Sequence, residues 1–105
     1  MKLKYTPQAL NDLQELKTYI GKTLHNARAA RRITKSILDS CGRLKEHPQL
    51  GMSLEAKTGI ETDLRYLLCE KHLALYHVED DLILVVRILD GRSDYLRILF
   101  PGSIE

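Results

Sequence analysis

The last third of the chain carries the hydrophobic pattern of three consecutive β-strands. Short polar pairs separate three apolar runs, and connections of two residues join antiparallel neighbours. The pattern therefore predicts a three-stranded antiparallel meander with a tail after its last strand. The predicted strands are 64–69, 72–78 and 82–89, joined by turns at Glu70-Lys71 and Asp80-Asp81 and followed by a tail at 90–97.

The first half of the chain predicts one strand and two helices. A strand at 2–5 is followed by Thr6 and Pro7, the residue types preferred at a helix N-cap and at the first helical position. Asn26 can cap a second helix, which Pro48 ends. Apolar residues at three- and four-residue steps mark the buried stripes. These are Leu10, Leu13, Leu16 or Lys17, Ile20 and Leu24 in the first helix, and Ala29 or Ala30, Ile33, Ile37, Cys41 and Leu44 in the second.

The expected fold class is α+β in a single domain, 1–105. An N-terminal strand leads into an antiparallel two-helix hairpin, which covers one face of the meander, and a short C-terminal tail follows. The place of the first strand in the sheet is left open. Residues 48–62 form the one long loop, which we expect to be mobile or to contact a partner.

Alternation along the strands separates two faces of the predicted sheet. With two-residue turns, Arg65 lies opposite Tyr76 and Ala74 lies opposite Arg87, although a bulge would change this register. We expect the leucine-rich face to pack on the helices and the arginine face to stay open. The alternative is that Arg87 is buried and paired with a helix carboxylate or with Asp94. The open face holds Arg65, Leu67, His72, Ala74, Tyr76, Val85 and Arg87, and the packed face holds Leu68, Leu73, Leu75, Leu84, Val86 and Ile88.

Composition places the chain among ordinary soluble globular proteins, with 44% hydrophobic and 29% charged residues. No apolar run approaches the roughly 18 residues of a membrane span, and the start lacks a signal-peptide core. We therefore expect a cytoplasmic protein in which Cys41 and Cys69 are buried, reduced thiols. Residues 1–55 hold ten Lys/Arg against five Asp/Glu, and 56–105 hold six against nine. The basic half could meet nucleic acid or an acidic partner, but a solvated face is the favoured interpretation.

The usual signatures of metal and cofactor sites are missing from the sequence. His72 and His77 are five residues apart on one strand, so they point to opposite faces and do not share a metal. There is no paired-cysteine motif, no glycine-rich phosphate loop and no nucleophile elbow. We expect no metal and no cofactor.

The chain resembles the RelE/ParE superfamily of toxins from type II toxin–antitoxin modules. The resemblance implies two helices packed on a small antiparallel sheet. It also implies a growth-inhibiting toxin of a plasmid stabilisation module, neutralised by a cognate antitoxin. It rests on the order and spacing of residues 6–13, residues 38–48 with Gly51, and residues 63–65, 75–78 and 88–94.

Two branches of this superfamily differ in function. RelE-like chains cut messenger RNA on the ribosome, but their strand arginine falls here on Leu73, which neither binds phosphate nor donates a proton. Residues 64–72 resemble instead the ParE-like branch, which is associated with inhibition of DNA gyrase. The chain departs from that branch at Asp90, where ParE-like chains commonly carry histidine. We expect a gyrase-binding toxin without enzymatic activity. The alternative is a ribosome-dependent endoribonuclease that uses Arg65, Arg92 and Tyr95.

Two groups of residues are the candidate binding sites. We expect the tail to be pinned by Leu96, Leu99 and Phe100, and the basic side of the second helix to attract an acidic antitoxin segment. Sequence-specific DNA binding by this chain alone is not expected. The target-binding candidates are Arg65, Arg87, Arg92, Asp94, Tyr95 and Arg97, and the antitoxin-binding candidates are Arg28, Arg31, Arg32 and Lys35.

Overall fold

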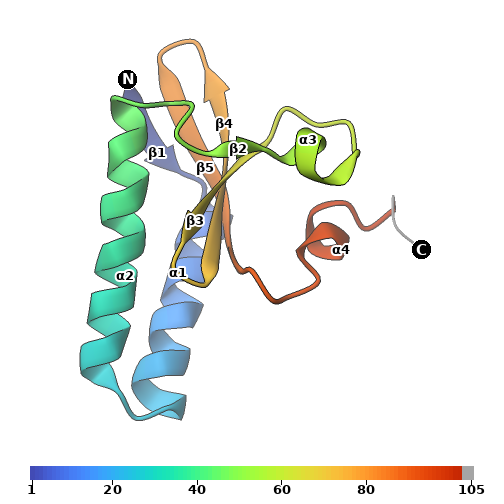
Figure 1. The fold of residues 1–105 in the computed structure, drawn as a ribbon. Coiled ribbons are helices and arrows are strands. Elements are labelled where there is room, and N and C mark those ends of the chain that lie inside the picture. Colours follow the sequence, from blue (N-terminus) through green and yellow to red (C-terminus); the bar gives the residue numbers. More distant parts are fainter. Residues whose placement is uncertain (103–105) are drawn as a thin grey trace.

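The computed structural model describes residues 1–102 and confirms the predicted order of strand, helical hairpin, meander and tail (Figure 1). Residues 103–105 of the expected domain lie outside the described residues. The elements are β1 (Lys2–Tyr5), α1 (Pro7–Thr18), the π-helical turn η1 (Tyr19–Thr23), α2 (Ala27–Gly42), the 3-10 turn η2 (Arg43–Lys45), β2 (Met52–Ser53), α3 (Leu54–Thr58), β3 (Arg65–Cys69), β4 (His72–Glu79), β5 (Leu82–Asp90) and α4 (Tyr95–Leu99).

Both predicted helix caps are present. The side chain of Thr6 accepts a hydrogen bond from the backbone N–H of Ala9 at 3.1 Å, and that of Asn26 accepts one from Ala29 at 3.0 Å. The predicted stripe of α2 is buried or packed against the core, whereas the stripe of α1 is only partly correct. Leu10 and Leu24 are 53% and 55% exposed. The buried side of α1 runs instead through Ala9, Asp12, Leu13 and Leu16, with Ile20 following in η1.

The sheet is mixed and has five strands in the order β1-β5-β4-β3-β2. β1 pairs in parallel with β5, with Lys2 opposite Leu82, which settles the position that the sequence left open. The expected long loop at 48–62 contains β2 and α3, so the expectation of an irregular loop was wrong. The Ser53 side chain caps α3, and Gly59 ends it at φ 78°, a left-handed conformation that suits glycine.

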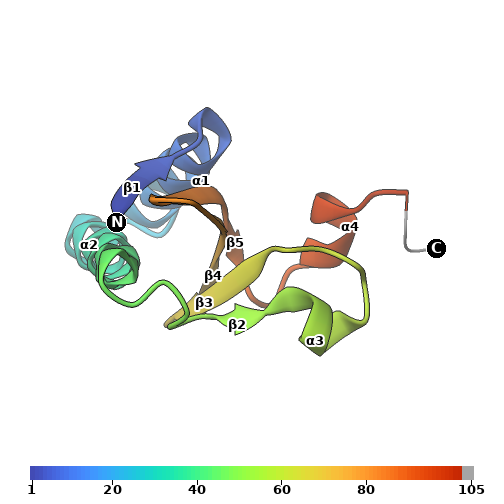
Figure 2. The ribbon, with the colours of Figure 1, turned by 90° about the horizontal axis from the view of Figure 1, so that it is seen from above.

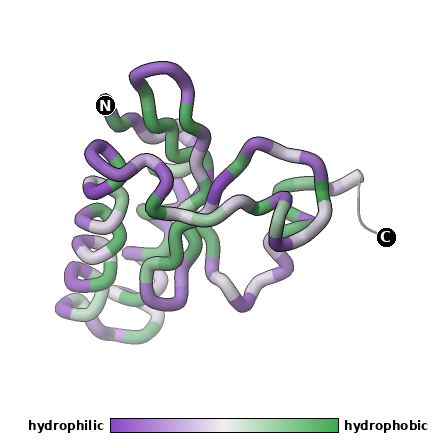
Figure 3. The backbone as a smooth tube through the Cα atoms, turned by 45° about the horizontal axis from the view of Figure 1, so that its top comes forward, coloured by the Kyte–Doolittle hydropathy of each residue, from purple (hydrophilic) through white to green (hydrophobic). Residues whose placement is uncertain are grey.

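The helical hairpin covers the face of the sheet that we expected to be open. Leu67, Ala74, Tyr76 and Val85 form one core cluster with residues of α1 and α2, so the assignment of the two faces was wrong. Figure 2 shows the hairpin on one side of the sheet and α3 with α4 on the other. Figure 3 shows hydrophobic residues concentrated in the strands and alternating with hydrophilic ones along α2.

A second cluster, here called the leucine cluster, lies beneath α3 and α4. Leucine content did not distinguish the two faces because both are covered, one by the hairpin and the other by these two short helices. Leu68, expected in the core, is 63% exposed. The leucine cluster consists of Leu54, Leu64, Leu73, Leu75 and Leu89, with Tyr66, Val86, Tyr95, Leu99 and Phe100 packed against it.

Both turns of the meander have two residues, as predicted, and Arg65 lies opposite Tyr76. A bulge then interrupts the pairing of β4 with β5, because Tyr76 faces Val85 whereas Leu75 faces Arg87. Val86 is the extra residue of β5. Ala74 therefore lies opposite Ile88 and not opposite Arg87, which corrects the predicted register.

Arg87 is bonded to a helix carboxylate and does not belong to an open face. Its Nε and Nη2 donate to Asp12 of α1 at 2.8 and 3.1 Å, and the backbone N–H of Ile88 donates to the same carboxylate at 2.9 Å. The Asp12 side chain is buried, and its hydrogen bond raises the pKa of Arg87. The alternative pairing with a helix carboxylate is confirmed.

Tyr76 fixes residues 48–51 to the sheet. Its hydroxyl is buried, accepts from the Gly51 N–H at 3.0 Å and donates to the Pro48 carbonyl at 2.9 Å. A Cβ on Gly51 would lie 2.5 Å from the Tyr66 carbonyl oxygen and 2.6 Å from the Tyr76 hydroxyl. Only glycine fits there. The Nη2 of Arg65 adds a bond to the Gly51 carbonyl at 2.5 Å.

We predict that Asp12→Ala lowers the free energy of unfolding by about 2–4 kcal/mol, because it leaves the Arg87 guanidinium and the Ile88 N–H without their partner. Urea unfolding followed by circular dichroism measures this loss. Asp12→Asn keeps an oxygen for Ile88 and should lose less. A loss under about 0.5 kcal/mol for Asp12→Ala would contradict this role of the carboxylate.

We predict that Tyr76→Phe costs about 1–3 kcal/mol, since the buried Gly51 N–H and Pro48 carbonyl lose their shared partner. Tyr66→Phe is the matched control, because the Tyr66 hydroxyl only approaches the Met52 sulfur, at 3.6 Å on the surface. Thermal unfolding of the two variants compares them. Equal stability of both variants would show that the Tyr76 hydroxyl does not hold this segment.

Candidate functional site

The tail after β5 presents charged side chains in two local ion pairs. Arg92 Nη2 lies 3.2 Å from the Asp90 carboxylate, and Arg97 Nε lies 2.8 Å from Asp94. The bonds from Arg92 lower the pKa of Asp90. All four side chains remain substantially exposed. The structure thus brings together four predicted target-binding residues, Arg92, Asp94, Tyr95 and Arg97, on one short segment.

The tail is anchored to the protein through the leucine cluster. Leu99 and Phe100 pack there, as predicted, whereas Leu96 is absent from the cluster and Tyr95 belongs to it. The Lys57 ammonium of α3 lies 4.8 Å from the Tyr66 ring centre and 5.9 Å from that of Tyr95. Cation–π contacts at these distances link α3 to β3 and to α4. Tyr95 is therefore an anchor as well as part of the surface.

The two strand arginines lie apart from the tail group. Arg87 is held by Asp12, and Arg65 donates to the backbone carbonyls of Gln49 and Gly51 at 3.4 and 2.5 Å. Arg65 pairs with Tyr76, on the hairpin side of the sheet, while Tyr95 packs on the other side. The residues of the alternative nuclease set are therefore not gathered at one place. Leu73 is 3% exposed within the leucine cluster.

The basic side of α2 is exposed over its length, as its spacing predicts. Of its four candidate cations, two form ion pairs within the described residues and two do not. Arg32 lies 2.9 Å from Glu70 in the β3–β4 turn, and Lys35 lies 2.7 Å from Asp39 one helical turn further on. Arg28 and Arg31 take part in no ion pair among residues 1–102. Two of these cations already hold carboxylates, and two are free to bind an external anion.

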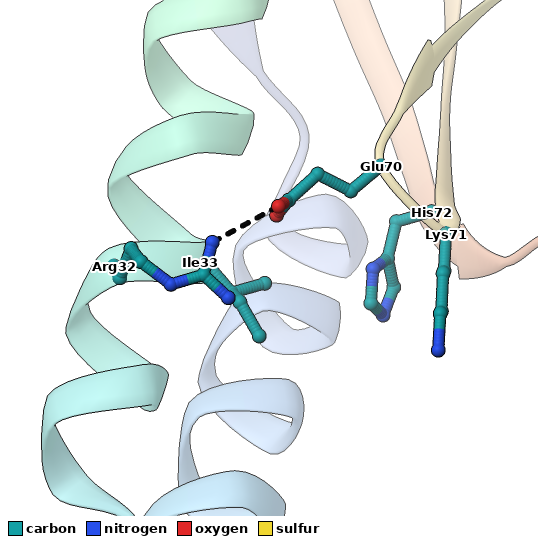
Figure 4. Close-up of a pocket in the computed structure, with 5 residues that line it drawn as sticks. All are labelled: Arg32, Ile33, Glu70, Lys71 and His72. Atoms are coloured by element: carbon teal, nitrogen blue, oxygen red, sulfur yellow. Dashed lines mark hydrogen bonds and ion pairs between the residues drawn. The ribbon is translucent and has the colours of Figure 1, made fainter.

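The structure contains a cavity beside Arg32 that the sequence did not predict. It has a volume of about 170 Å³ and is lined by Arg32, Ile33, Glu70, Lys71 and His72, as Figure 4 shows. The Nδ1 of His72 is buried without a hydrogen-bond partner, and burial lowers the pKa of this histidine, which favours the neutral imidazole. No sequence motif marks this cavity, because it forms only where the β3–β4 turn meets α2.

Within the described residues, no group of three His, Cys, Asp or Glu side chains could hold a metal ion. In the same part of the chain, no helix is both long and apolar enough to cross a membrane. Cys41 and Cys69 are free and buried, as expected. Hydrogen bonding to Cys69, together with burial, raises the pKa of the Cys41 thiol, so it is a poor nucleophile.

Comparisons with known proteins agree with the fold. A family model described as the ParE toxin of the type II toxin–antitoxin system parDE matches residues 3–95. A solved structure titled "Chromosomal ParDE TA system from P. aeruginosa" superposes with a TM-score of 0.72 at 22% identity and covers 86% of this chain and 95% of the other. No curated protein shows significant similarity to this sequence.

Proposed function

The chain belongs to the ParE toxin family of type II toxin–antitoxin systems, and from this premise we propose that it inhibits DNA gyrase by protein–protein binding and is neutralised by a cognate antitoxin. The observation that carries the proposal is the anchored tail, which offers two arginines and a tyrosine on one short segment. Because this target acts on the chromosome in bacteria, the proposal includes a cytoplasmic location.

The tail has the physical properties of a binding surface. Arginine and tyrosine are enriched among the residues that dominate binding energy at interfaces. Leu99 and Phe100 hold the segment against the leucine cluster, so less ordering entropy is lost on binding than with a free tail. The ion pairs Arg92–Asp90 and Arg97–Asp94 are exposed and worth about 0–1 kcal/mol each. A target carboxylate can therefore replace either partner at little cost.

The structure offers less support for the alternative, a ribosome-dependent endoribonuclease. Such chemistry needs groups that bind phosphate and move protons at one place. Arg65 is bonded to backbone carbonyls on the hairpin side of the sheet, and Tyr95 packs on the opposite side. Leu73 occupies the position of the RelE-like arginine and is buried. Binding without catalysis is the function that this arrangement supports best.

We predict that Arg92→Ala with Arg97→Ala raises the concentration needed for half-inhibition of gyrase supercoiling by about tenfold or more. Both side chains are exposed, so the free energy of unfolding should stay within about 0.5 kcal/mol of wild type. Tyr95 is spared because its loss would also loosen the tail. Lys2→Ala with Lys4→Ala, on the exposed side of β1, is the control and should inhibit normally.

Full inhibition by the folded tail variant would move the gyrase-binding surface elsewhere. Cleavage of messenger RNA on translating ribosomes, with no effect on gyrase, would instead support the endoribonuclease. Both assays should therefore use the same purified protein. Growth inhibition in cells that lack the antitoxin links either result to toxicity.

For the antitoxin we propose an acidic segment with apolar anchors on the side of α2 that holds Arg32 and Lys35. Both cations already bind carboxylates of this chain, Glu70 and Asp39, in exposed pairs that an antitoxin carboxylate could replace. The cavity beside Arg32 is walled by Ile33 and is open to a small apolar side chain (Figure 4). The charge of this side of α2 and the shape of the cavity both favour an acidic segment with an apolar anchor.

We predict that Arg32→Glu with Lys35→Glu weakens binding of the antitoxin encoded beside this chain by about tenfold or more, because each change replaces attraction by repulsion. Calorimetry at two salt concentrations measures the loss, and wild-type binding should weaken as salt rises. Lys2→Glu with Lys4→Glu is the charge-matched control. If the α2 variant binds as tightly as the control, the antitoxin does not use this side of α2.

A further inference from the structure

The outer side of the helical hairpin contains a groove whose charged residues are all cationic. It lies where α1 and η1 run beside the start of α2, at the end of the molecule far from the N-terminus (Figure 1). Its volume is about 370 Å³. Polar and small residues make up the rest, and no carboxylate of the described residues lines it. The lining residues are Gln14, Lys17, Thr18, Gly21, Lys22, Ala27, Ala30 and Arg31.

The cations of this groove form no ion pair within the part of the chain that the structure describes. Lys17, Lys22 and Arg31 take part in no ion pair among residues 1–102, and neither does the neighbouring Arg28. The ion-paired cations lie elsewhere, and each of them has a carboxylate within 3.2 Å: Arg32, Lys35, Arg87, Arg92 and Arg97. Gathering like charges without a partner is unfavourable in the free protein and favours an external anion.

The floor of the groove is made of small residues. A Cβ on Gly21 would lie 3.7 Å from the Ala30 Cβ, which reflects how closely the two helices approach here. Gly21, Ala27 and Ala30 bring no large apolar side chain to the groove against which the anchors of a peptide helix could pack. A ligand that is recognised by its repeating charge alone fits this groove better than an acidic protein segment does.

We propose that this groove binds the phosphate backbone of duplex DNA without regard to base sequence. Lys17 and Lys22 come from one wall and Arg31 comes from the other, and Arg28 lies three residues before Arg31 on the same face of α2. Double-stranded DNA presents one phosphate charge about every 1.7 Å of helix axis, so adjacent cations can contact successive phosphates. The inference goes beyond the proposed function, since it concerns free DNA and needs no gyrase.

The test is fluorescence anisotropy of a short labelled duplex with the full chain. With about four phosphate contacts, the logarithm of the association constant should fall with the logarithm of the salt concentration with a slope of about −3.6. The affinity for DNA should then fall about 150-fold between about 50 and 200 mM salt. Lys22→Gln with Arg31→Gln should halve this slope to about −1.8 and weaken binding at the lower salt by about tenfold or more. Lys2→Gln with Lys4→Gln removes the same charge from β1 and should leave binding within about twofold of wild type.

Three outcomes would overturn the inference. The first is the absence of DNA binding at the lower salt, and the second is an equal loss of binding in the groove variant and the β1 control. The third is tighter binding of a polyglutamate peptide of matching charge, which would assign the groove to an acidic protein segment. Gyrase inhibition, which we propose to depend on the tail, is measured in a separate assay with the tail variant, so either proposal can fail without the other.

Discussion

The bonds between Asp12 and β5 are the constraint on which the rest of the structure depends. One buried carboxylate of α1 accepts from the Arg87 guanidinium and from the Ile88 backbone. The bulge at Val86 allows Arg87 to reach α1 while Ile88 enters the hairpin core, so the bulge and the ion pair support each other. β5 also carries β1, β4 and the tail. The position of the hairpin relative to the tail therefore follows from this contact.

The two covered faces of the sheet give the molecule two separate exposed regions. The hairpin buries one face and presents its cations outward, whereas α3 and α4 bury the leucine cluster and present the tail. The sheet lies between α2 and the tail, whereas Leu16 and Tyr19 of the hairpin line one cavity with Ser93 and Ile98. A protein of this size can therefore bind one partner through the tail and another through α2 without the two surfaces overlapping.

Features that depend on neighbours in sequence were predicted well. Thr6 and Asn26 cap the helices, and both meander turns have two residues, because these features need only local residue types. Ser53 and Gly59 were also local signals for α3, but the short helix between them was missed. The face assignment was wrong because it depends on which distant elements cover the sheet.

The same distinction between local sequence and distant contacts applies to the candidate sites. Exposure of the α2 cations and the pairing of Lys35 with Asp39 follow from helical spacing, whereas the pairing of Arg32 does not, since Glu70 lies 38 residues from Arg32 along the chain. Arg65 and Arg87 looked alike as isolated cations in apolar strands. Their partners, the Gly51 carbonyl and Asp12, are fixed by the fold and the bulge, which no local pattern reports. The tail residues were expected to lie together because all four fall within residues 92–97.

The parallel pairing of β1 with β5 has a consequence for synthesis of the protein. The Thr6 hydroxyl donates to the Val86 carbonyl across 80 residues, and among residues 1–102 β1 pairs in the sheet with β5 alone. While the ribosome is still making the meander, β1 lacks its partner strand and the Asp12 carboxylate lacks Arg87 and the Ile88 backbone. Closing so long a loop is entropically costly, and native structure must wait for it. An unfinished chain that stops before β5 therefore lacks the sheet that supports the tail, so the surface proposed to bind the target forms only after β5 has been made.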